Sequence, residues 1–402
     1  MFSTGVMVLL ILLIVIEVLT INVIRQHFYD RSWMSYYFIM TVNAVMSIWL
    51  WVLWIKITSF TGIYDQPENI SAITGFHGML CMVVMPRAIL ILFHYSGILI
   101  RRKSEGGYST ILTKTGMIIA ALLFVVISAG SLFGRFNFVT EYQEVKIKGL
   151  KKDLEGLRIV HISDIHLTSF YHQQNKLEEV MKKINELKPD ILVNTGDFIT
   201  IGWRESGRSD SILSLPSARY GKFAIMGNHD FGTYHPYFTE AEMENNVLIM
   251  NRFIASAGYK VLNDEFAMVN IGNARIAMIG VKTKGSFPHI IHGNLKKATE
   301  RIYGADLRIL LAHDPNQWDE EVAGKTNIDL TLSGHTHGMQ IGILTKKLKW
   351  SPAVFFYPRW NGLYSEGTQY LAVNRGLGVL GMPFRIWMPP EITVITLRND
   401  HN

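Results

Sequence analysis

Four apolar segments near the N-terminus constrain this chain more than any other feature of its sequence. They cover residues 4–24, 36–60, 73–100 and 115–133. A helix needs about 20 apolar residues to cross a bilayer core, where every backbone polar group must be satisfied without water. We therefore expect residues 1–140 to form a transmembrane region of four helices. The composition agrees, because 49% of the 402 residues are hydrophobic and only 18% are charged.

The charges of the connecting loops predict the orientation of these spans. The loop near residue 30 carries Arg25 and Arg31 against Asp30, and the loop near residue 105 is rich in lysine and arginine. The second loop carries Asp65 and Glu68 and no basic residue. Loops rich in basic residues stay in the cytoplasm. We therefore expect a multi-pass protein of the cell (inner) membrane, with residues 141–402 outside the cytoplasm. The first segment has no basic start and no small-residue cleavage site, so we expect it to be a retained span.

Several ionisable residues lie within the apolar segments. A buried charge in a membrane is costly and raises the possibility of a functional site. We expect instead that these groups pair with one another or reach the ends of their helices, and we assign them no chemistry. They are Glu17, His77, Arg87 and His94.

The remaining composition excludes some kinds of protein. Cys81 is the single cysteine, so neither an internal disulfide nor a thiolate metal cluster is possible. The net charge of +6 is modest and no continuous basic stripe follows residue 141, so we expect no nucleic-acid partner.

Residues 141–402 alternate between short apolar runs and helical patterns, which predicts a layered α/β domain. Residues 176–187 place their apolar side chains on one helical face, and residues 240–257 are a second predicted helix. Residues 269–271 and 274–279 flank Gly272-Asn273, a turn typical of a hairpin. Other predicted strands cover residues 157–162, 191–193, 223–226, 309–311, 328–332 and 391–397.

Polar residues that bind metals or phosphates follow five of these strands. Because the carboxyl ends of strands in an α/β sheet meet at one edge, we expect these groups to converge. The first four motifs, taken alone, are more often structural or surface elements such as turns or a buried histidine, and the last, with two histidines two residues apart, is a stronger signal. Five in succession after strands favour a site. They are Asp164-Ile165-His166, Gly196-Asp197, Gly227-Asn228-His229-Asp230, His313-Asp314 and Gly334-His335-Thr336-His337-Gly338.

The residue types predict the chemistry of this site. Two divalent metal ions a few ångströms apart activate water and neutralise charge on a phosphoryl group during ester hydrolysis. A mixed set of imidazole, carboxylate and amide ligands suits Mn, Fe, Zn or Co rather than a soft metal.

The ordered motifs resemble those of the calcineurin-like metallophosphoesterase family, which are DxH, GD, GNH, H and GHxH. Residues 370–378 and 389–392 resemble the bacterial membrane-associated branch, which includes exported phosphoesterases and some lipid A precursor pyrophosphohydrolases. The resemblance covers about residues 145–398. It implies an α/β domain of the αββα sandwich type over residues 141–402, and attack of a metal-bridging hydroxide on a phosphodiester or phosphomonoester.

The resemblance also implies a role for each site residue. Asp197 would bridge both metal ions, and His229 would stabilise the phosphoryl group or donate a proton to the leaving oxygen. Asp230 would orient the His229 imidazole. The other ligands would be Asp164, His166 and His337 for the first ion, and Asn228, His313 and His335 for the second.

A stretch of aromatic and basic residues, 346–360, follows the last motif. It either contacts a lipid surface or packs Phe355, Phe356 and Trp360 onto the sheet. A phosphate ester is the expected substrate, with a lipid-linked one favoured by the membrane anchor. The predicted orientation disfavours a cytoplasmic nucleotide-sugar precursor. The alternative function is a catalytically silent scaffold or sensor, although such a protein is expected to lose ligands and here the set is complete.

Overall fold

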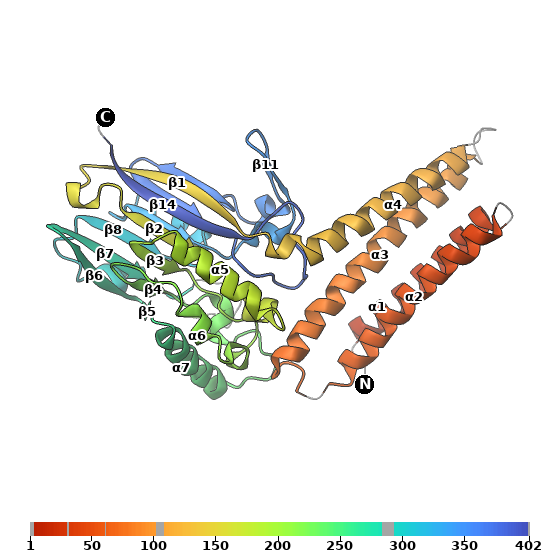
Figure 1. Cartoon of the computed structure of the whole chain (residues 1–402), viewed down its shortest axis with the longest axis horizontal. Coiled ribbons are helices and arrows are strands. Elements are labelled where there is room, and N and C mark those ends of the chain that lie inside the picture. Colours follow the sequence, from red (N-terminus) through yellow and green to blue (C-terminus); the bar gives the residue numbers. More distant parts are fainter. Residues whose placement is uncertain (1–3, 30–31, 61, 102–107, 284–292, 401–402) are drawn as a thin grey trace. The chain divides into compact units, whose positions relative to one another are not determined.

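The computed structural model describes residues 4–29, 32–60, 62–101, 108–283 and 293–400. These residues form two compact units (Figure 1). The first, here called the membrane unit, comprises Met1–Thr61, Ala72–Leu132 and Gly381–Phe384. The second, here called the catalytic unit, comprises Gly62–Ser71, Phe133–Leu380 and Arg385–Asn402. A short link between two membrane helices is therefore part of the catalytic unit.

The membrane unit is built on four long helices, as the apolar segments predict. They are α1 (Thr4–Phe28), α2 (Trp33–Thr58), α3 (Pro67–Arg101) and α4 (Tyr108–Leu132). Their candidate spans, Met7–Phe28, Trp33–Thr58, Pro67–Ile100 and Thr110–Phe136, are long and apolar enough to cross a membrane. The charged loop residues 30, 31, 102, 103 and 105 lie outside the described residues.

The ionisable groups of the helices are paired, which confirms the structural interpretation of the sequence. Arg87 Nη1 lies 2.6 Å from the Glu17 carboxylate, and Arg87 Nη2 donates to Ser47 Oγ at 2.7 Å. His94 contacts Thr113 Oγ1 and Gln26 Oε1, both at 3.0 Å. Glu17, Arg87 and His94 are thus held by side chains of neighbouring helices, whereas His77 Nδ1 lies 2.9 Å from the Gly381 carbonyl oxygen.

The catalytic unit contains two six-stranded sheets. The first has the order β1–β14–β2–β3–β4–β5, and the second has the order β12–β13–β9–β8–β7–β6. The strands of the first are β1 (Val139–Lys148), β14 (Glu391–Asp400), β2 (Arg158–Ile162), β3 (Ile191–Asn194), β4 (Lys222–Ala224) and β5 (Lys260–Val261). Those of the second are β12 (Gly362–Glu366), β13 (Gln369–Val373), β9 (Leu330–Ser333), β8 (Leu307–Leu311), β7 (Ala274–Gly280) and β6 (Glu265–Ile271).

Three hydrophobic clusters separate the layers. One joins the facing sides of the two sheets, with Ile159 and Val193 from the first sheet and Met278 from the second. Another lies between the first sheet and the helices α5 (Gln174–Glu186), α6 (Asp210–Leu213) and α7 (Glu240–Ser256). The third covers the outer side of the second sheet with α8 (Leu295–Thr299) and the π-helix η6 (Trp318–Val322). Helices therefore flank two stacked sheets, and the αββα expectation is confirmed.

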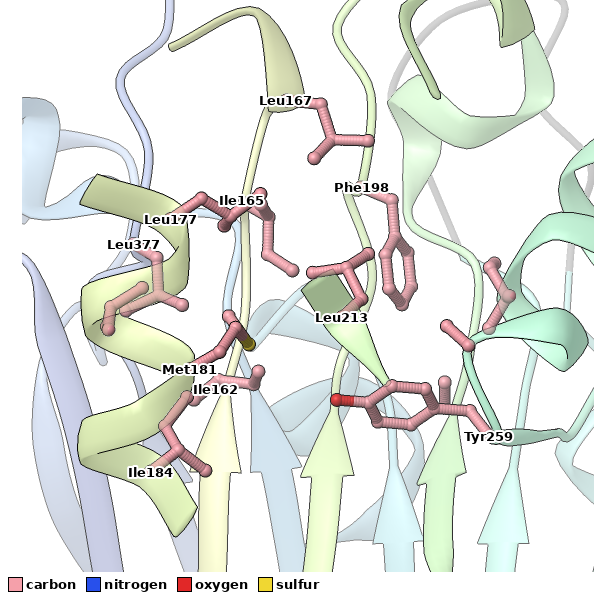
Figure 2. Packing of buried hydrophobic residues seen from close by; sticks show 14 of the residues in the cluster. Ile162, Ile165, Leu167, Leu177, Met181, Ile184, Phe198, Leu213, Tyr259 and Leu377 are labelled. Atoms are coloured by element: carbon pink, nitrogen blue, oxygen red, sulfur yellow. The ribbon is translucent and has the colours of Figure 1, made fainter. Parts of the chain in front are cut away.

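The helix α5 forms where the apolar periodicity of the sequence predicts a helix. Its buried residues recur three and four positions apart, so they lie on one face. Figure 2 shows Leu177, Met181 and Ile184 pointing from α5 toward the sheet, where Ile162 of β2 lies. The observed bounds differ from the predicted helix, 176–187, by at most two residues.

The C-terminal strand lies inside the first sheet rather than at its edge. β14 pairs in parallel with β1 and antiparallel with β2. Asn374 Nδ2 donates to Thr393 Oγ1 of β14 at 2.8 Å. The last described residues of the chain thus connect β1 to the strands that carry the predicted ligands.

Candidate metal centre

The predicted ligands follow the carboxyl ends of parallel strands in both sheets. Asp164 and His166 follow β2, and Asp197 follows β3. Asn228 begins the 3-10 helix η5 (Asn228–Phe231), which follows β4. The remaining three come from the second sheet: His313 follows β8, and His335 and His337 follow β9. Since β2, β3 and β4 run parallel, as do β8 and β9, these ends meet at one edge.

Asp164, His166 and His337 form the first half of the site. Their ligand atoms all lie within 4.8 Å of one another, and all three residues are buried. His166 Nε2 lies 3.2 Å from His337 Nε2. His337 Nε2 lies 3.3 Å from Asp164 Oδ1. These side chains are the predicted ligands of the first metal ion.

Asp197, His313 and His335 form the second half. His313 Nε2 lies 3.1 Å from Asp197 Oδ2 and 3.2 Å from His335 Nδ1. Asp197 Oδ2 also lies 3.7 Å from His166 Nε2 in the first half. The Asp197 carboxylate therefore lies between the two halves, where a bridging ligand must be.

The hydrogen bonds of two imidazoles leave one nitrogen of each ring available to bind a cation. His166 Nδ1 donates to Ile199 O at 3.1 Å, and His313 Nδ1 donates to Thr195 O at 2.7 Å. A carbonyl only accepts, so in each neutral ring Nε2 is the nitrogen with a free lone pair. Those lone pairs point into the site. This is the arrangement in which metal-binding histidines are held.

Asn228 provides a further indication. Its Nδ2 donates to Tyr234 Oη at 2.9 Å, whereas its buried Oδ1 has no hydrogen-bond partner among the described residues. An unsatisfied buried carbonyl oxygen is destabilising unless something binds it. Oδ1 is the atom that a divalent ion prefers, so the residues of the centre fit the metal pair that the motifs predict.

The electrostatics of the centre follow from two buried carboxylates among imidazoles. Burial alone raises the pKa of Asp164, but the neighbouring His337 and His313 outweigh it and hold the pKa below its usual value. Burial lowers the pKa of His313, but the Asp197 charge outweighs burial and raises the pKa of this imidazole to about 10. The carboxylates thus stay ionised and attract positive charge, a proton or a metal ion.

Five of the ligands have an unusual backbone. Asp164, His166, Asp197, His335 and His337 have φ between 42° and 71°, a region that residues other than glycine rarely adopt. Such strain gathers at functional sites because surrounding structure holds it there. Gly227 permits one of these turns, since a Cβ at this position would meet the Asp197 carboxylate.

His229 lies beside the first half of the centre, with its ring centroid 5.0 Å from that of His166. Its Nδ1 donates to Thr200 O at 2.6 Å. The ring stacks on Tyr234 at 4.1 Å between centroids. His229 is thus fixed in orientation with Nε2 as its remaining nitrogen.

Asp230 does not orient this imidazole, and that expectation is corrected. Its carboxylate accepts hydrogen bonds from the backbone amides of Asp197, Phe198, Ile199 and Gly227 at 2.8–3.1 Å. Burial, and then the Asp197 charge, raises the pKa of Asp230 to about 8. Its carboxylate joins the loops after β3 and β4, whereas His229 Nδ1 donates its hydrogen bond to the Thr200 carbonyl.

Sequence patterns did not reveal the residues that support the ligands. Tyr357 Oη lies 2.9 Å from His335 Nε2, and the buried Arg385 lies 3.3 Å from His337 Nδ1. Arg385 also donates to Gly378 O at 2.6 Å. Neither residue belongs to a motif. The Tyr-Pro-Arg and Phe-Arg segments that contain them were the available signals, since a charged or phenolic group among apolar residues needs a partner.

Comparisons with known proteins agree with this geometry. Residues 157–339 match the calcineurin-like phosphoesterase family. The uncharacterized metallophosphoesterase YkuE of Bacillus subtilis is 28% identical over 296 residues, which are 70% of this chain and 95% of that protein. The UDP-2,3-diacylglucosamine pyrophosphatase LpxG of Chlamydia trachomatis is 29% identical over 286 residues, 60% of this chain and 84% of LpxG.

The name of a third relative indicates that it too is a transmembrane protein. A transmembrane protein with metallophosphoesterase domain from Danio rerio is 31% identical over 265 residues, which are 63% of this chain and 56% of that protein. The matched family region holds every predicted ligand from Asp164 to His337. Residues 157–339 of this chain therefore form a calcineurin-like metallophosphoesterase domain, the kind of domain that hydrolyses phosphoric esters.

Proposed function

We propose that this protein is a membrane-anchored, two-metal phosphoesterase whose substrate is a membrane-proximal or lipid-linked phosphate ester outside the cytoplasm. The observation that carries the proposal is the pair of adjoining half-sites, Asp164–His166–His337 and Asp197–His313–His335. Both halves meet at the Asp197 carboxylate, which lies within 3.7 Å of an imidazole nitrogen of each.

Asp164, His166 and His337 would hold one divalent ion, and Asn228, His313 and His335 the other, with Asp197 shared. When bound, such ions supply an activated water and neutralise charge on the phosphoryl oxygens. The mixed ligand set favours Mn, Fe, Zn or Co. The surrounding structure that holds five ligands in a strained backbone would also keep their side chains in place before substrate arrives, so little reorganisation would accompany the reaction.

His229 would move the proton of the reaction. Its Nδ1 is committed to Thr200 O, so the protonated ring would donate its Nε2 proton to the leaving-group oxygen or to a phosphoryl oxygen and become neutral. Stacking on Tyr234 keeps the ring plane in one orientation. The His229 backbone amide also donates to Asp197 Oδ1 at 2.9 Å, which ties the proton donor to the shared ligand.

The substrate class rests on the membrane helices and on the relatives. Basic loops favour a cytoplasmic side for the first and third connections, which leaves the catalytic unit outside. One relative is named for a diacylated substrate, which supports an acylated phosphate ester here. The orientation argues against a nucleotide sugar of the cytoplasm, so we favour a lipid-linked phosphate on the outer side of the cell membrane.

Hydrolysis of two chromogenic esters by the purified full chain tests the catalytic part of the proposal. Bis-p-nitrophenyl phosphate and p-nitrophenyl phosphate would be compared with and without Mn²⁺. We expect metal-dependent turnover that Asp197→Ala abolishes. Asp210→Ala, a change on the helix α6 outside the ligand set, should retain it. Metal binding without turnover of either ester would contradict an active phosphoesterase and favour the scaffold function.

Labelling in intact cells tests the orientation. Tyr303 is 77% exposed in the catalytic unit, and Cys81 is the single cysteine. A Cys81→Ser, Tyr303→Cys variant should react with a membrane-impermeant maleimide without permeabilisation. Labelling only after permeabilisation would place the catalytic unit in the cytoplasm.

A further inference from the structure

The catalytic unit has an exposed apolar surface beside the metal centre, which we call the aromatic rim. It consists of Leu348, Trp350, Val354, Phe355, Phe356 and Trp387, each between 42% and 75% exposed. These residues lie on the hairpin of β10 (Ile343–Leu344) and β11 (Lys349–Trp350), on and just after the 3-10 helix η8 (Pro352–Phe355), and on a loop that follows β13. Figure 1 shows the hairpin near β11 projecting from the body of the catalytic unit.

The segments of the rim are packed together rather than scattered. Ile341 pairs with Ile386, next to Trp387, and Gly342 N donates to Ile386 O at 3.1 Å. Beneath them, Ala353, Trp360 and Met388 form a small buried cluster. Trp360 is only 6% exposed, so of the three aromatic residues singled out in the sequence it belongs to the core. Phe355 and Phe356 are 75% and 65% exposed and have no such packing role.

The rim is joined directly to the metal ligands. Tyr357, the residue after Phe356, contacts His335 Nε2 at 2.9 Å. Ser351 Oγ, between Trp350 and η8, donates to Gly338 O at 2.6 Å. Gly338 follows the ligand His337. Whatever the rim binds is therefore held within a few residues of both halves of the centre.

The composition of the rim favours one occupant. Lys346 and Lys347 form the tip of the hairpin, and Lys349 lies on β11. Tryptophan and phenylalanine beside lysines are typical of segments that lie in the interfacial layer of a bilayer with anionic headgroups. The same chain has four helices long and apolar enough to span a membrane, so the catalytic unit is covalently linked to segments that fit a bilayer. Trp387 also follows in sequence the segment Gly381–Phe384, which belongs to the membrane unit and ends three residues earlier.

We propose that the aromatic rim inserts into the interfacial layer of an anionic membrane and so presents a lipid-linked phosphate to the metal centre. The aromatic side chains enter among the upper acyl-chain carbons, and the three lysines contact headgroup phosphates. The insertion follows from the rim alone, whereas the presentation of substrate rests on the proposed phosphoesterase function. The substrate is accordingly a phosphate ester that keeps its apolar chain in the bilayer during hydrolysis.

Insertion is measured on the full chain reconstituted in vesicles of phosphatidylcholine and phosphatidylglycerol. Single Phe355→Cys and Phe356→Cys variants in a Cys81→Ser background would carry an environment-sensitive fluorophore, with Tyr303→Cys as the matched exposed control. We expect quenching at positions 355 and 356 by spin-labelled acyl chains and protection from aqueous iodide, with the reverse at position 303.

Two results would overturn insertion. Equal iodide quenching at positions 355 and 303 would show that the rim faces water. Protection at 355 from both quenchers would show that protein covers it. Replacement of phosphatidylglycerol by phosphatidylcholine should weaken the lipid quenching, because the lysines then lose their anionic partners.

The substrate step is measured by a ratio of activities. A Phe355→Ser, Phe356→Ser variant should lose about tenfold or more in the ratio of turnover of vesicle-embedded phosphatidylglycerol phosphate to turnover of bis-p-nitrophenyl phosphate, because two apolar rings would no longer enter the bilayer. An unchanged ratio in a variant that still hydrolyses both would refute the presentation of lipid. If wild-type protein hydrolyses neither ester, the phosphoesterase function fails, while the quenching result stands by itself.

Discussion

The carboxylate of Asp65, in the link between α2 and α3, accepts a hydrogen bond from Arg204 Nη1 at 2.7 Å. The same carboxylate lies 3.5 Å from His235 Nε2. Arg204 precedes Glu205, which holds the loop at Thr200, and His235 follows Tyr234, which stacks on His229. A residue from the N-terminal third of the chain thus supports both segments that orient the proposed proton donor.

Replacement of Asp65 by alanine should therefore slow catalysis without loss of metal. An exposed ion pair contributes up to about 1 kcal/mol, so we expect at most a fivefold fall in turnover, roughly. Glu178→Ala is the matched control, because it breaks the exposed pair with Lys182 on α5, whose two charged atoms are 2.6 Å apart. Steady-state kinetics and metal analysis check this. Equal turnover in the two variants would show that the Asp65 link does not act on the site.

Replacement of His229 by asparagine should remove the proton donor and leave both metal ions bound. We expect a loss of about a hundredfold or more in turnover of a phenyl phosphodiester, the range of general acid catalysis. The loss should be smaller for bis-p-nitrophenyl phosphate, because nitrophenolate leaves readily without a proton. The comparison of the two esters, with metal content measured, separates this role from metal binding. An equal loss on both esters would mean that His229 acts on the phosphoryl group instead.

Tyr357→Phe should weaken the second metal site selectively. The hydroxyl contacts His335 Nε2 at 2.9 Å, and loss of such an outer partner lowers metal affinity by about tenfold or more. Calorimetric titration of the full chain with metal ions measures the affinities of the two sites separately. Tyr220→Phe, at a half-buried tyrosine on the opposite side of the first sheet from the helices, is the control and should bind metal like wild type. Unchanged affinity in Tyr357→Phe would contradict support of His335 by the hydroxyl.

Glu205 should give the protein a pH-dependent stability. Burial raises the pKa of this carboxyl above its ordinary value, and the carboxylate accepts hydrogen bonds from the amides of Thr200, Ile201 and Gly202. A raised folded-state pKa means that the folded protein binds the proton more tightly, so the contribution is complete below the ordinary glutamate pKa. It is lost as pH rises toward the raised value.

Glu205→Gln tests this dependence by thermal unfolding of the metal-loaded chain at pH 5 and pH 8. At pH 5 we expect the variant to be less stable than wild type by about 1–3 kcal/mol, because one backbone amide loses its acceptor. At pH 8 this difference should shrink, because wild type has lost the contribution of protonated Glu205. Glu178→Gln, on the exposed face of α5, should match wild type at both values. A difference that grows with pH would mean that the carboxyl is ionised throughout.

Much of this arrangement was predictable from sequence because the relevant signals are local. The ligands follow buried strands, and the hairpin β6–β7 forms at Gly272-Asn273 as its turn chemistry predicts. The helix α7 begins at Glu240 behind a Thr239 capping box, as the predicted start at residue 240 requires. By contrast, β1 carries exposed charged residues on an edge strand, so its pattern resembles a surface segment until its pairing with β14 is known.

The parts that were not predictable depend on contacts distant in sequence. Nothing near Asp65 indicates that its link packs with the loop at Arg204, 139 residues later. The hydrogen bond that orients His229 comes from the backbone of Thr200, and a backbone acceptor leaves no trace in residue identity. In the sequence Arg385 is an isolated charge, because only the folded structure identifies the carbonyl groups to which it donates.

The position of β14 has a consequence for biosynthesis. Because residues 391–400 separate β1 from β2, the first sheet cannot be completed while the ribosome still holds them. The nascent catalytic unit must wait, with β1 unpaired, while its membrane helices are already made. Completion of the sheet that carries Asp164, His166, Asp197 and Asn228 is thereby deferred until residues 391–400 have been synthesised.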